Sequence, residues 1–258
     1  MPSIFQSFFI SLIIQCGFFA IAATKKTDKV TDLSYGLSFV AIALYFYSSS
    51  SSHSISQTLV LILILLWGLR LAWFLFQRVL VVGKDTRFDG IRENPFRFGL
   101  FWLLQAVSIW IIMLPGTLFL STSVPLSISI ATVIGTALVL CGLAIETIAD
   151  LQKSTFKANP NNKGMWVNQG LWKYARHPNY FGEMLVWWGV FIIVIPTLDG
   201  PTWLTICSPL YISFLLLFVT GIPTVSKIHE QKYGANPKYQ EYKRNTRLLI
   251  PLPKQKTV

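Results

Sequence analysis

The stretch "YARHPNYFGEMLVWW", residues 174–188, joins a polar segment directly to an apolar one. Its second half reads as the start of a membrane span, yet Arg176 and His177 stand at its threshold and Glu183 lies within it. A carboxylate is costly inside a membrane and is normally kept there because it pairs with another group or faces a polar cavity. The stretch therefore predicts a membrane helix that begins at a polar site.

The rest of the chain has the composition of a membrane protein. Of its 258 residues, 53% are hydrophobic and only 13% are charged, which lies outside the range of ordinary soluble domains. A helix needs about 20 apolar residues to cross a bilayer of roughly 30 Å. Runs of that kind occur at residues 4–23, 32–49, 56–81, 98–120, 123–147, 180–198 and 202–226. We therefore predict an all-α polytopic membrane protein with seven transmembrane helices, folded as a single domain over residues 1–258.

The distribution of basic residues predicts the orientation in the membrane. Lys and Arg gather in the first, third and fifth connections and in the tail, whereas "SSSSSHSIS", "STSVP" and "TLDGPT" contain none. By the positive-inside rule, the N-terminus lies outside and the C-terminus lies in the cytoplasm. This placement accounts for all 22 basic residues except Arg70, so the net charge of +11 does not indicate nucleic-acid binding. The first span has no basic segment ahead of it, so we expect it to stay as a helix and not to be removed as a signal peptide.

Ionisable residues gather toward the cytoplasmic side of the spans. Asp32 begins the second span, Arg70 lies in the inner half of the third, Glu146 and Asp150 end the fifth, and Glu183 lies in the first turns of the sixth. This pattern indicates a polar pocket that opens to the cytosol. Structural ion pairs, for example between Asp32 and Arg70, explain the same residues equally well when they are considered alone. The cysteines are dispersed without metal-ligand spacing, so we expect no metal site: Cys16, Cys141 and Cys207.

Spacing along the fifth span favours a functional site. On a continuous helix, Glu146, Asp150, Lys153 and Lys157 share one face, because they follow one another at intervals of four, three and four residues. Two acceptors followed by two cations suit a ligand that carries both hydroxyls and phosphates. The stripe therefore favours a nucleotide.

The sixth span adds a second element of the same site. Pro178 is suited to the first turn of a helix, so Asn179 and Glu183 lie one turn apart behind the threshold of Arg176 and His177. A helix N-terminus flanked by arginine can bind an anion such as a phosphate. Neither GxGxxG nor GxxxxGK[ST] occurs, so the predicted nucleotide site is not of the Rossmann or P-loop kind.

The run "GMWVNQGLWKYARHPNYFGEMLVWWG", residues 164–189, resembles the C-terminal signature of the membrane steroid 5-alpha-reductase family, including bacterial members filed under an uncharacterised-domain name. The resemblance covers roughly residues 130–251 well and the N-terminal half loosely. Its motif RHPNYxGE is specific to a superfamily rather than to one activity. Related forms occur in reductases of other sterol double bonds and, as RHPxYxG, in isoprenylcysteine and phospholipid methyltransferases.

The resemblance implies a seven-helix, NADPH-dependent reductase that delivers hydride to the carbon–carbon double bond of a 4-ene-3-ketosteroid or a similar lipid enone. At the cofactor cavity of the family, Glu146 stands where the animal enzymes have Asn, Asp150, Asn179 and Glu183 match, and Lys157 replaces an Arg. We expect NADPH to be bound by Lys84, Arg87, Glu146, Asp150, Lys157, Arg176, His177, Asn179, Tyr180, Glu183 and His229.

In the N-terminal half, "TDLSYGLSF" looks like the segment whose Gln-Glu pair touches the substrate ketone, which places Thr31 and Asp32 in those roles. The Tyr-x-x-Arg of the family is Trp67-Gly68-Leu69-Arg70 here, so Trp67 replaces the tyrosine donor. An indole donates a hydrogen bond but is not a practical proton donor. Asp32 is therefore the expected acid if it is buried, and Tyr35, one turn later, is the alternative. Arg70 either holds the cofactor or steadies Asp32.

Two other classes remain open. An S-adenosylmethionine-dependent methyltransferase shares RHPxY, but its cofactor carries no phosphate and does not need Lys153 and Lys157. A channel or sensor is disfavoured because charge collects on the cytoplasmic side. We expect a monomer that contacts membrane lipids and takes a lipid-soluble steroid or enone. We expect it in the bacterial inner membrane, or in the endoplasmic reticulum of a eukaryote, with the active site open to the cytoplasm.

Overall fold

The structure is a computed structural model that describes residues 2–51, 53–82, 88–123 and 127–253. Within these residues the chain is helical and contains no strands, which confirms the predicted all-α class. The chain forms two compact units. The N-terminal unit comprises residues 1–134 and 190–208, and the C-terminal unit comprises residues 135–189 and 209–258. The prediction of a single domain stays a prediction.

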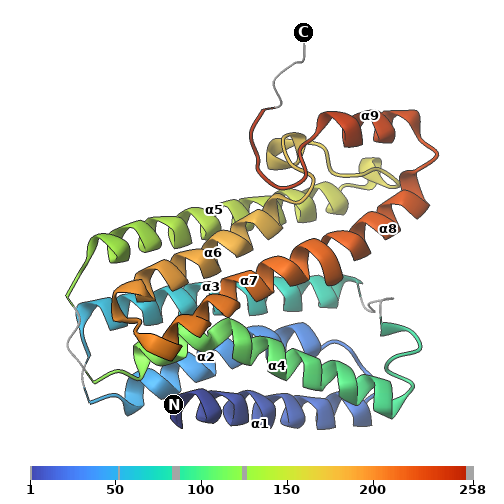
Figure 1. Cartoon of the computed structure of the whole chain (residues 1–258). Coiled ribbons are helices and arrows are strands. Elements are labelled where there is room, and N and C mark those ends of the chain that lie inside the picture. Colours follow the sequence, from blue (N-terminus) through green and yellow to red (C-terminus); the bar gives the residue numbers. More distant parts are fainter. Residues whose placement is uncertain (1, 52, 83–87, 124–126, 254–258) are drawn as a thin grey trace. The chain divides into compact units, whose positions relative to one another are not determined.

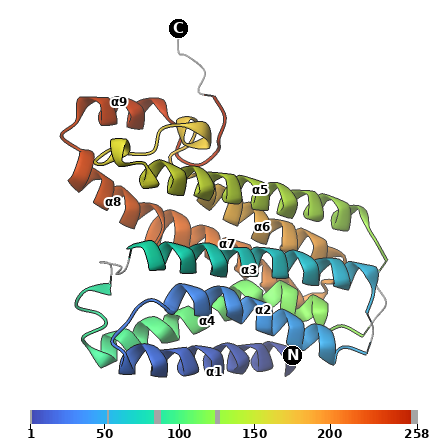
Figure 2. The same ribbon diagram turned by 180° about the vertical axis from the view of Figure 1, so that it is seen from behind.

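Four helices form the body of the N-terminal unit: α1 (Pro2–Thr24), α2 (Thr31–Ser49), α3 (Ile55–Val82) and α4 (Pro95–Leu120). α2 packs most extensively against α3, and α1 packs most extensively against α4, as both ribbon views show (Figures 1 and 2). Asn94 caps α4, because its side-chain oxygen accepts from the backbone N–H groups of Phe96 and Arg97 at 3.1 Å. Pro95 then occupies the first helical turn, where a missing N–H costs nothing. The expected span at residues 98–120 thus begins three residues earlier.

α2 is the polar helix of this unit. Its buried face carries Ser34 and Ser38, and the Nε2 atom of Gln15 in α1 donates to Ser38 Oγ at 2.8 Å. Gln105 in α4 donates to Gln15 Oε1 at 2.9 Å and to Ser34 Oγ at 3.1 Å. These groups satisfy one another across three helices, as polar side chains inside membranes must.

Six stretches of the described chain are long and apolar enough to cross a membrane, and they indicate an integral multi-pass membrane protein. They are Ser3–Thr24, Ile55–Val79, Pro95–Leu120, Ile130–Ala158, Pro178–Thr197 and Gly200–Tyr233. α2 is not among them, because serines, tyrosines and an aspartate lower its hydropathy. The seven-span count and the orientation of the termini stay predictions.

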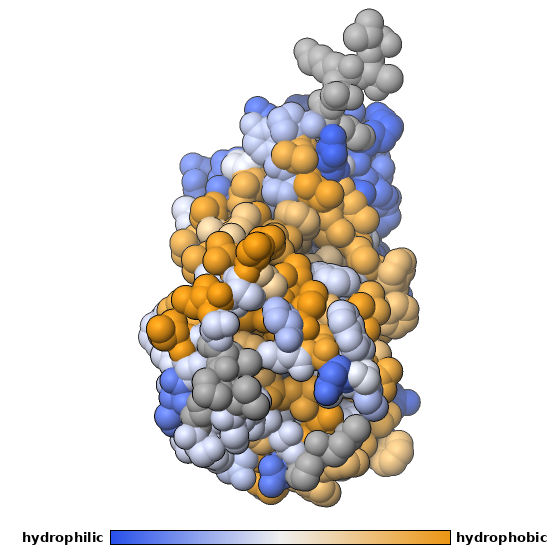
Figure 3. Space-filling view, turned by 60° about the vertical axis from the view of Figure 1, so that its left-hand side comes forward, coloured by the Kyte–Doolittle hydropathy of each residue, from blue (hydrophilic) through white to orange (hydrophobic). Residues whose placement is uncertain are grey.

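Large apolar side chains lie on the surface of the spans. Phe5 and Ile13 of α1, Trp73 of α3 and Leu104 of α4 are each more than half exposed. Figure 3 shows hydrophobic residues spread over much of one face. Exposure of this extent exceeds what soluble monomers tolerate and fits contact with lipid.

The C-terminal unit contains most of α5 (Ile130–Ala158) and α6 (Pro178–Val194), and parts of a broken final span. The fifth span was expected at residues 123–147, but its helix begins at Ile130 and continues to Ala158. The later start has a local cause, since Ser129 and Thr132 exchange backbone and side-chain hydrogen bonds that begin the helix.

The final span, expected at residues 202–226, is not one regular helix. It consists of a 3-10 segment (η5, Gly200–Ile206), α7 (Cys207–Phe214), a π-helical segment (η6, Leu215–Val219) and α8 (Ile222–Tyr233). A short helix, α9 (Pro237–Asn245), follows. Gly221 separates η6 from α8 with φ −78° and ψ −94°, a conformation outside the helical region that interrupts the span.

α5 and α6 approach each other backbone to backbone. A Cβ atom at Gly142 would lie 2.5 Å from the carbonyl oxygen of Gly182, and one at Gly182 would lie 2.8 Å from Cβ of Glu146. One further contact follows along the helices, because a Cβ atom at Gly189 would lie 2.7 Å from the carbonyl oxygen of Gly135. Small residues at such spacing let membrane helices pack closely. The packing fixes Glu146 beside the first turns of α6.

Candidate functional site

The predicted stripe on α5 forms on an uninterrupted helix. Because α5 runs through Ala158, Glu146, Asp150, Lys153 and Lys157 share one face. The two acids are buried, Lys153 is partly buried and Lys157 is exposed. The stripe therefore passes from buried acceptors to a solvent-facing cation.

The loop between α5 and α6 folds back onto the end of α5. The indole Nε1 of Trp172 donates to the carbonyl oxygen of Ala149 at 2.9 Å, and the backbone N–H of Leu171 donates to Gln152 Oε1 at 2.8 Å. Gly170 adopts φ +59° against Gln152, where a Cβ atom would collide with the amide group. Lys153 places its ammonium group 5.1 Å from the ring centroid of Trp172. These contacts tie the loop to the stripe.

His177 lies buried at the threshold of α6. Its ring stacks on Tyr180 with centroids 5.5 Å apart and an interplanar angle of 6°. Burial lowers the pKa of His177 from its ordinary value of 6.5 to about 3, and the positive charges of Lys153 and Arg176 add to the effect. The imidazole is therefore neutral at physiological pH.

His229 of α8 interacts electrostatically with the same basic residues as His177. Lys153 and Lys157 act on it electrostatically, and it acts in turn on His177. We refer to Lys153, Lys157, Arg176, His177 and His229 as the basic cluster. The Nε atom of Arg176 is buried and has no hydrogen-bond partner within the described part of the chain. A concentration of positive charge with an unused donor suits an anionic ligand.

The backbone at the threshold of α6 is engaged by the end of the chain. The N–H group of Arg176 donates to the carbonyl oxygen of Arg247 at 2.9 Å, and that of His177 donates to the carbonyl oxygen of Leu248 at 3.1 Å. Binding of an anion here would therefore fall to side chains and not to these two amides.

An aromatic cluster borders the basic cluster. Trp166 lies 5.8 Å from Tyr233, 5.2 Å from Tyr239 and 6.1 Å from Tyr242, measured between ring centroids. His229 contacts Tyr233 with centroids 5.6 Å apart. The sequence analysis did not identify this cluster. The available signal was the spacing of Tyr239 and Tyr242, one turn apart on α9.

The N-terminal unit holds the four predicted catalytic residues. Asp32 and Tyr35 lie one turn apart on α2, and Trp67 and Arg70 lie one turn apart on α3. Asp32 Oδ2 accepts from Nη2 of Arg78 at 2.8 Å. Arg78 stands about two turns further along α3 than Arg70, and the pairing of Asp32 with Arg70 stays a prediction.

Trp67 is fully buried in an aromatic ladder. Its ring meets Phe39 edge to face with centroids 5.0 Å apart, and Phe39 meets Tyr35 at 5.1 Å. Tyr35 is only partly buried. The ladder therefore makes Trp67 a core residue and leaves Tyr35 nearer the surface of the unit.

Asp28 forms an ion pair that the sequence did not indicate. Arg92 is 8% exposed and pairs with Asp28, which is 3% exposed, and also with Asp89. The pair ties the α1–α2 turn to the segment ahead of α4.

Of the predicted cofactor ligands, Lys84 and Arg87 lie outside the described residues.

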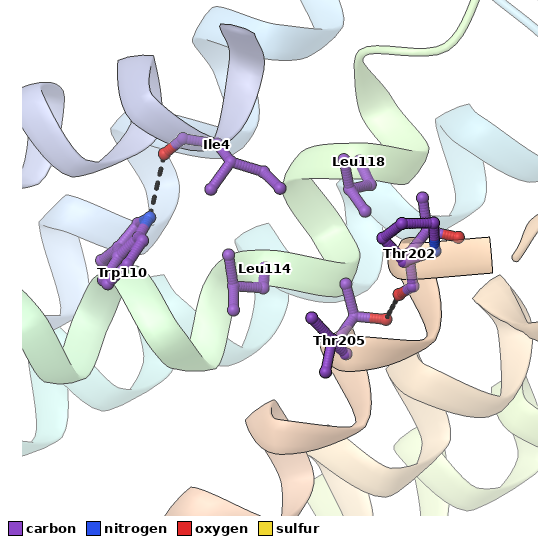
Figure 4. A pocket seen from close by; sticks show the side chains of 8 residues that line it. Ile4, Trp110, Leu114, Leu118, Thr202 and Thr205 are labelled. Atoms are coloured by element: carbon purple, nitrogen blue, oxygen red, sulfur yellow. Dashed lines mark hydrogen bonds between the residues drawn. The ribbon is translucent and has the colours of Figure 1, made fainter. Parts of the chain in front are cut away.

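Two pockets lie at the opposite end of α2 from Asp32. One, of about 240 Å³, is apolar, and its lining groups hydrogen-bond among themselves, as Trp110 Nε1 does with the carbonyl oxygen of Ile4 at 2.9 Å (Figure 4). The other, of about 400 Å³, includes Ser49 and Ser50. None of the predicted site residues lines either pocket.

The chain was compared with protein families, curated proteins and solved structures. A family model described as "Protein of unknown function (DUF1295)" matches residues 18–246, from within α1 to the end of α9. No curated protein and no solved structure matches the chain.

Proposed function

Because the chain belongs to the DUF1295 family, which is associated with steroid 5-alpha-reductase-like membrane proteins, we propose that it is an NADPH-dependent reductase of a carbon–carbon double bond. The substrate class is a 4-ene-3-ketosteroid or a similar lipid enone. The basic cluster carries this proposal, because its charge suits a phosphate-bearing cofactor better than a cofactor with a sulfonium cation.

The two candidate cofactors differ in charge. NADPH carries a pyrophosphate and a further phosphate, whereas S-adenosylmethionine carries a sulfonium cation and no phosphate. The positive charges of Lys153 and Arg176 help to keep His177 neutral. The same charges would stabilise phosphates and repel a sulfonium ion.

The donors and acceptors of the C-terminal unit fit a phosphate-bearing nucleotide. Lys157 and Arg176 would bind phosphate, with the buried Nε atom of Arg176 as an available donor. Glu146 and Asp150 would accept hydrogen bonds from hydroxyl or amide groups, as would Glu183. When bound, NADPH would supply a hydride.

On the substrate side, the proposal assigns proton donation to Tyr35. Asp32 is held by Arg78, and a carboxylate paired with a guanidinium accepts hydrogen bonds instead of donating them. Trp67 is buried and has no proton that it can practically release. Tyr35 would donate its phenolic proton to the ketone oxygen of the substrate, where negative charge builds during the reduction. Water then returns a proton to Tyr35, and the enol tautomerises to the saturated ketone.

Calorimetry on the detergent-extracted protein tests the proposal. NADPH should bind, S-adenosylmethionine should not, and NADPH should be oxidised when a 4-ene-3-ketosteroid is added. Lys157→Glu should weaken NADPH binding by about tenfold or more, because it reverses a charge contact to phosphate. Lys163→Glu is the matched control, since Lys163 is exposed on the loop outside the basic cluster. Tight binding of S-adenosylmethionine without binding of NADPH would establish the methyltransferase instead.

A further inference from the structure

The segment after α9, residues 246–253, runs beside the segment that leads into α6. We call residues 246–253 the C-terminal strap. Ala175 and Arg247 form a parallel bridge, in which the N–H of Arg247 donates to the carbonyl oxygen of Tyr174 at 3.3 Å. The bonds from Arg176 and His177 to the strap complete this pairing. In Figure 1 the strap follows α9 and turns back beside the loop ahead of α6.

Side chains anchor the strap at its start. The hydroxyl group of Tyr242 donates to the carbonyl oxygen of Trp172 at 2.7 Å, and burial raises the pKa of Tyr242, so the phenol stays protonated. Thr246 is buried, and its backbone N–H donates to the carbonyl oxygen of Tyr242 at 2.9 Å. The strap therefore leaves α9 at a fixed point and in a fixed direction.

The strap acts on two members of the basic cluster. Arg176 and His177 belong to an irregular segment, where their amides do not donate hydrogen bonds within a helix. The strap therefore supplies the acceptors for these amides. If the strap detached, both amides would lose these partners, and a buried unpaired amide is costly. The conformation that presents Arg176 and His177 to a ligand thus depends on residues about 70 positions later in the chain.

We propose that Tyr242 and the backbone of Arg247 and Leu248 are positioning residues for the anion site, so that the strap and the bound phosphate stabilise each other. The ligand chemistry rests on the proposed function. Coupling of this kind is reciprocal, so a ligand that binds through Arg176 should also hold the strap in place.

The first experiment compares Arg247→Pro with Arg247→Ala. Proline removes the N–H that bonds to Tyr174, whereas alanine keeps it and removes the same side chain. Thr246 has ψ 132°, an extended conformation that a following proline accepts, so the substitution acts on the bridge and not on the residue before it. Hydrogen exchange of the amides of Arg176 and His177 should be faster in Arg247→Pro by about tenfold or more than in Arg247→Ala.

The second experiment compares Tyr242→Phe with Tyr239→Phe. Only Tyr242 donates a hydrogen bond within the described residues, although both rings belong to the aromatic cluster. Tyr242→Phe should raise the Kd for NADPH about fivefold, as expected for the loss of one buried hydrogen bond, and kcat at saturating NADPH should stay within about twofold. Tyr239→Phe should leave the Kd unchanged.

A truncation after Asn245 gives a third test, with a truncation after Pro253 as its control. The first removes the strap, and the second keeps it. NADPH should slow the hydrogen exchange of the amides of Arg247 and Leu248 in the intact chain.

Two outcomes would overturn the proposal. One is unchanged hydrogen exchange at the amides of Arg176 and His177 in Arg247→Pro. The other is faster exchange at these amides without any change in the Kd for NADPH. If the intact chain does not bind NADPH, the proposed function fails, and inorganic pyrophosphate becomes the probe; the strap proposal then requires the same fivefold weakening for pyrophosphate in Tyr242→Phe.

Discussion

Replacing Gly182 by alanine should loosen the contact that holds Glu146 beside α6. The new Cβ atom would lie 2.6 Å from the carbonyl oxygen of Gly142 and 2.8 Å from both N and Cβ of Glu146. Carbon atoms normally approach no closer than about 3.5 Å, and two of these three atoms belong to the backbone of α5, which cannot rotate away. The helices must therefore separate. Overpacking of this kind costs about 1 to 3 kcal/mol, and the better helix propensity of alanine offsets up to about 1 kcal/mol of it.

We expect Gly182→Ala to lower the free energy of unfolding by about 1 to 2 kcal/mol and to weaken NADPH binding, because Glu146 moves away from its place. Thermal unfolding in detergent micelles measures the first effect, with a fall in Tm of about 2 to 4 °C per kcal/mol. Gly17→Ala is the matched control, because a Cβ atom at Gly17 in α1 meets nothing within 4 Å. If the two variants are equally stable, the close approach of α5 and α6 does not determine the packing, and the reasoning is refuted.

Four further predictions concern the topology, the proton donor, a buried ion pair and pH. In a cysteine-free background, single cysteines at positions 50 and 163 should label from opposite sides of the membrane, because the positive-inside rule places Ser50 outside and Lys163 inside. Tyr35→Phe should lower kcat about 100-fold or more and leave the Kd for NADPH unchanged. Asp28→Asn should cost about 3 kcal/mol of stability, because it removes the buried carboxylate beside a buried guanidinium and leaves Arg92 with Asp89 and Glu93, which are both about half exposed. His177→Gln should flatten the pH dependence of Tm below pH 6.5. The folded protein holds His177 neutral down to about pH 3, whereas the histidine of the unfolded chain binds a proton near pH 6.5. The stability of the wild-type protein should therefore fall as the pH drops through this range.

Each of these predictions has its own control or contrary outcome. Labelling of both cysteines from the same side of the membrane would refute the predicted topology. An unchanged kcat in Tyr35→Phe would exclude that phenol as the acid. Asp89→Asn should cost less than about 1 kcal/mol, because Asp89 is about half exposed. A wild-type Tm that depends on pH no more than that of His177→Gln would remove the role of the buried imidazole.

Local signals in the sequence were sufficient for some elements. α6 begins at Pro178 as predicted, because a proline in the first helical turn is a local preference. The stripe from Glu146 to Lys157 also depends only on the continuity of one helix. The shift of α5 to Ile130 and the π-helical segment Leu215–Val219 were missed, since a hydropathy window does not resolve caps or extra backbone turns.

Contacts between distant segments were beyond the sequence pattern. The pairing of Ala175 with Arg247 uses backbone atoms, which leave no mark in the residue types. The Asp28–Arg92 pair joins residues 64 positions apart, each in a segment with several other charges. The pairing of Asp32 with Arg78 was also not predictable, because it depends on the register of α2 against α3.

The polar network around Gln15 has a consequence for how the chain enters the membrane. α2 is too polar to partition into lipid strongly by itself, and its serines find donors only when Gln15 of α1 and Gln105 of α4 are present. Gln105 is synthesised about 70 residues after Ser34, so α2 leaves the ribosome before Gln105 does. We therefore expect α2 to wait beside α1 as a helical hairpin, and to settle in the bilayer core only when α4 arrives to complete its hydrogen bonds.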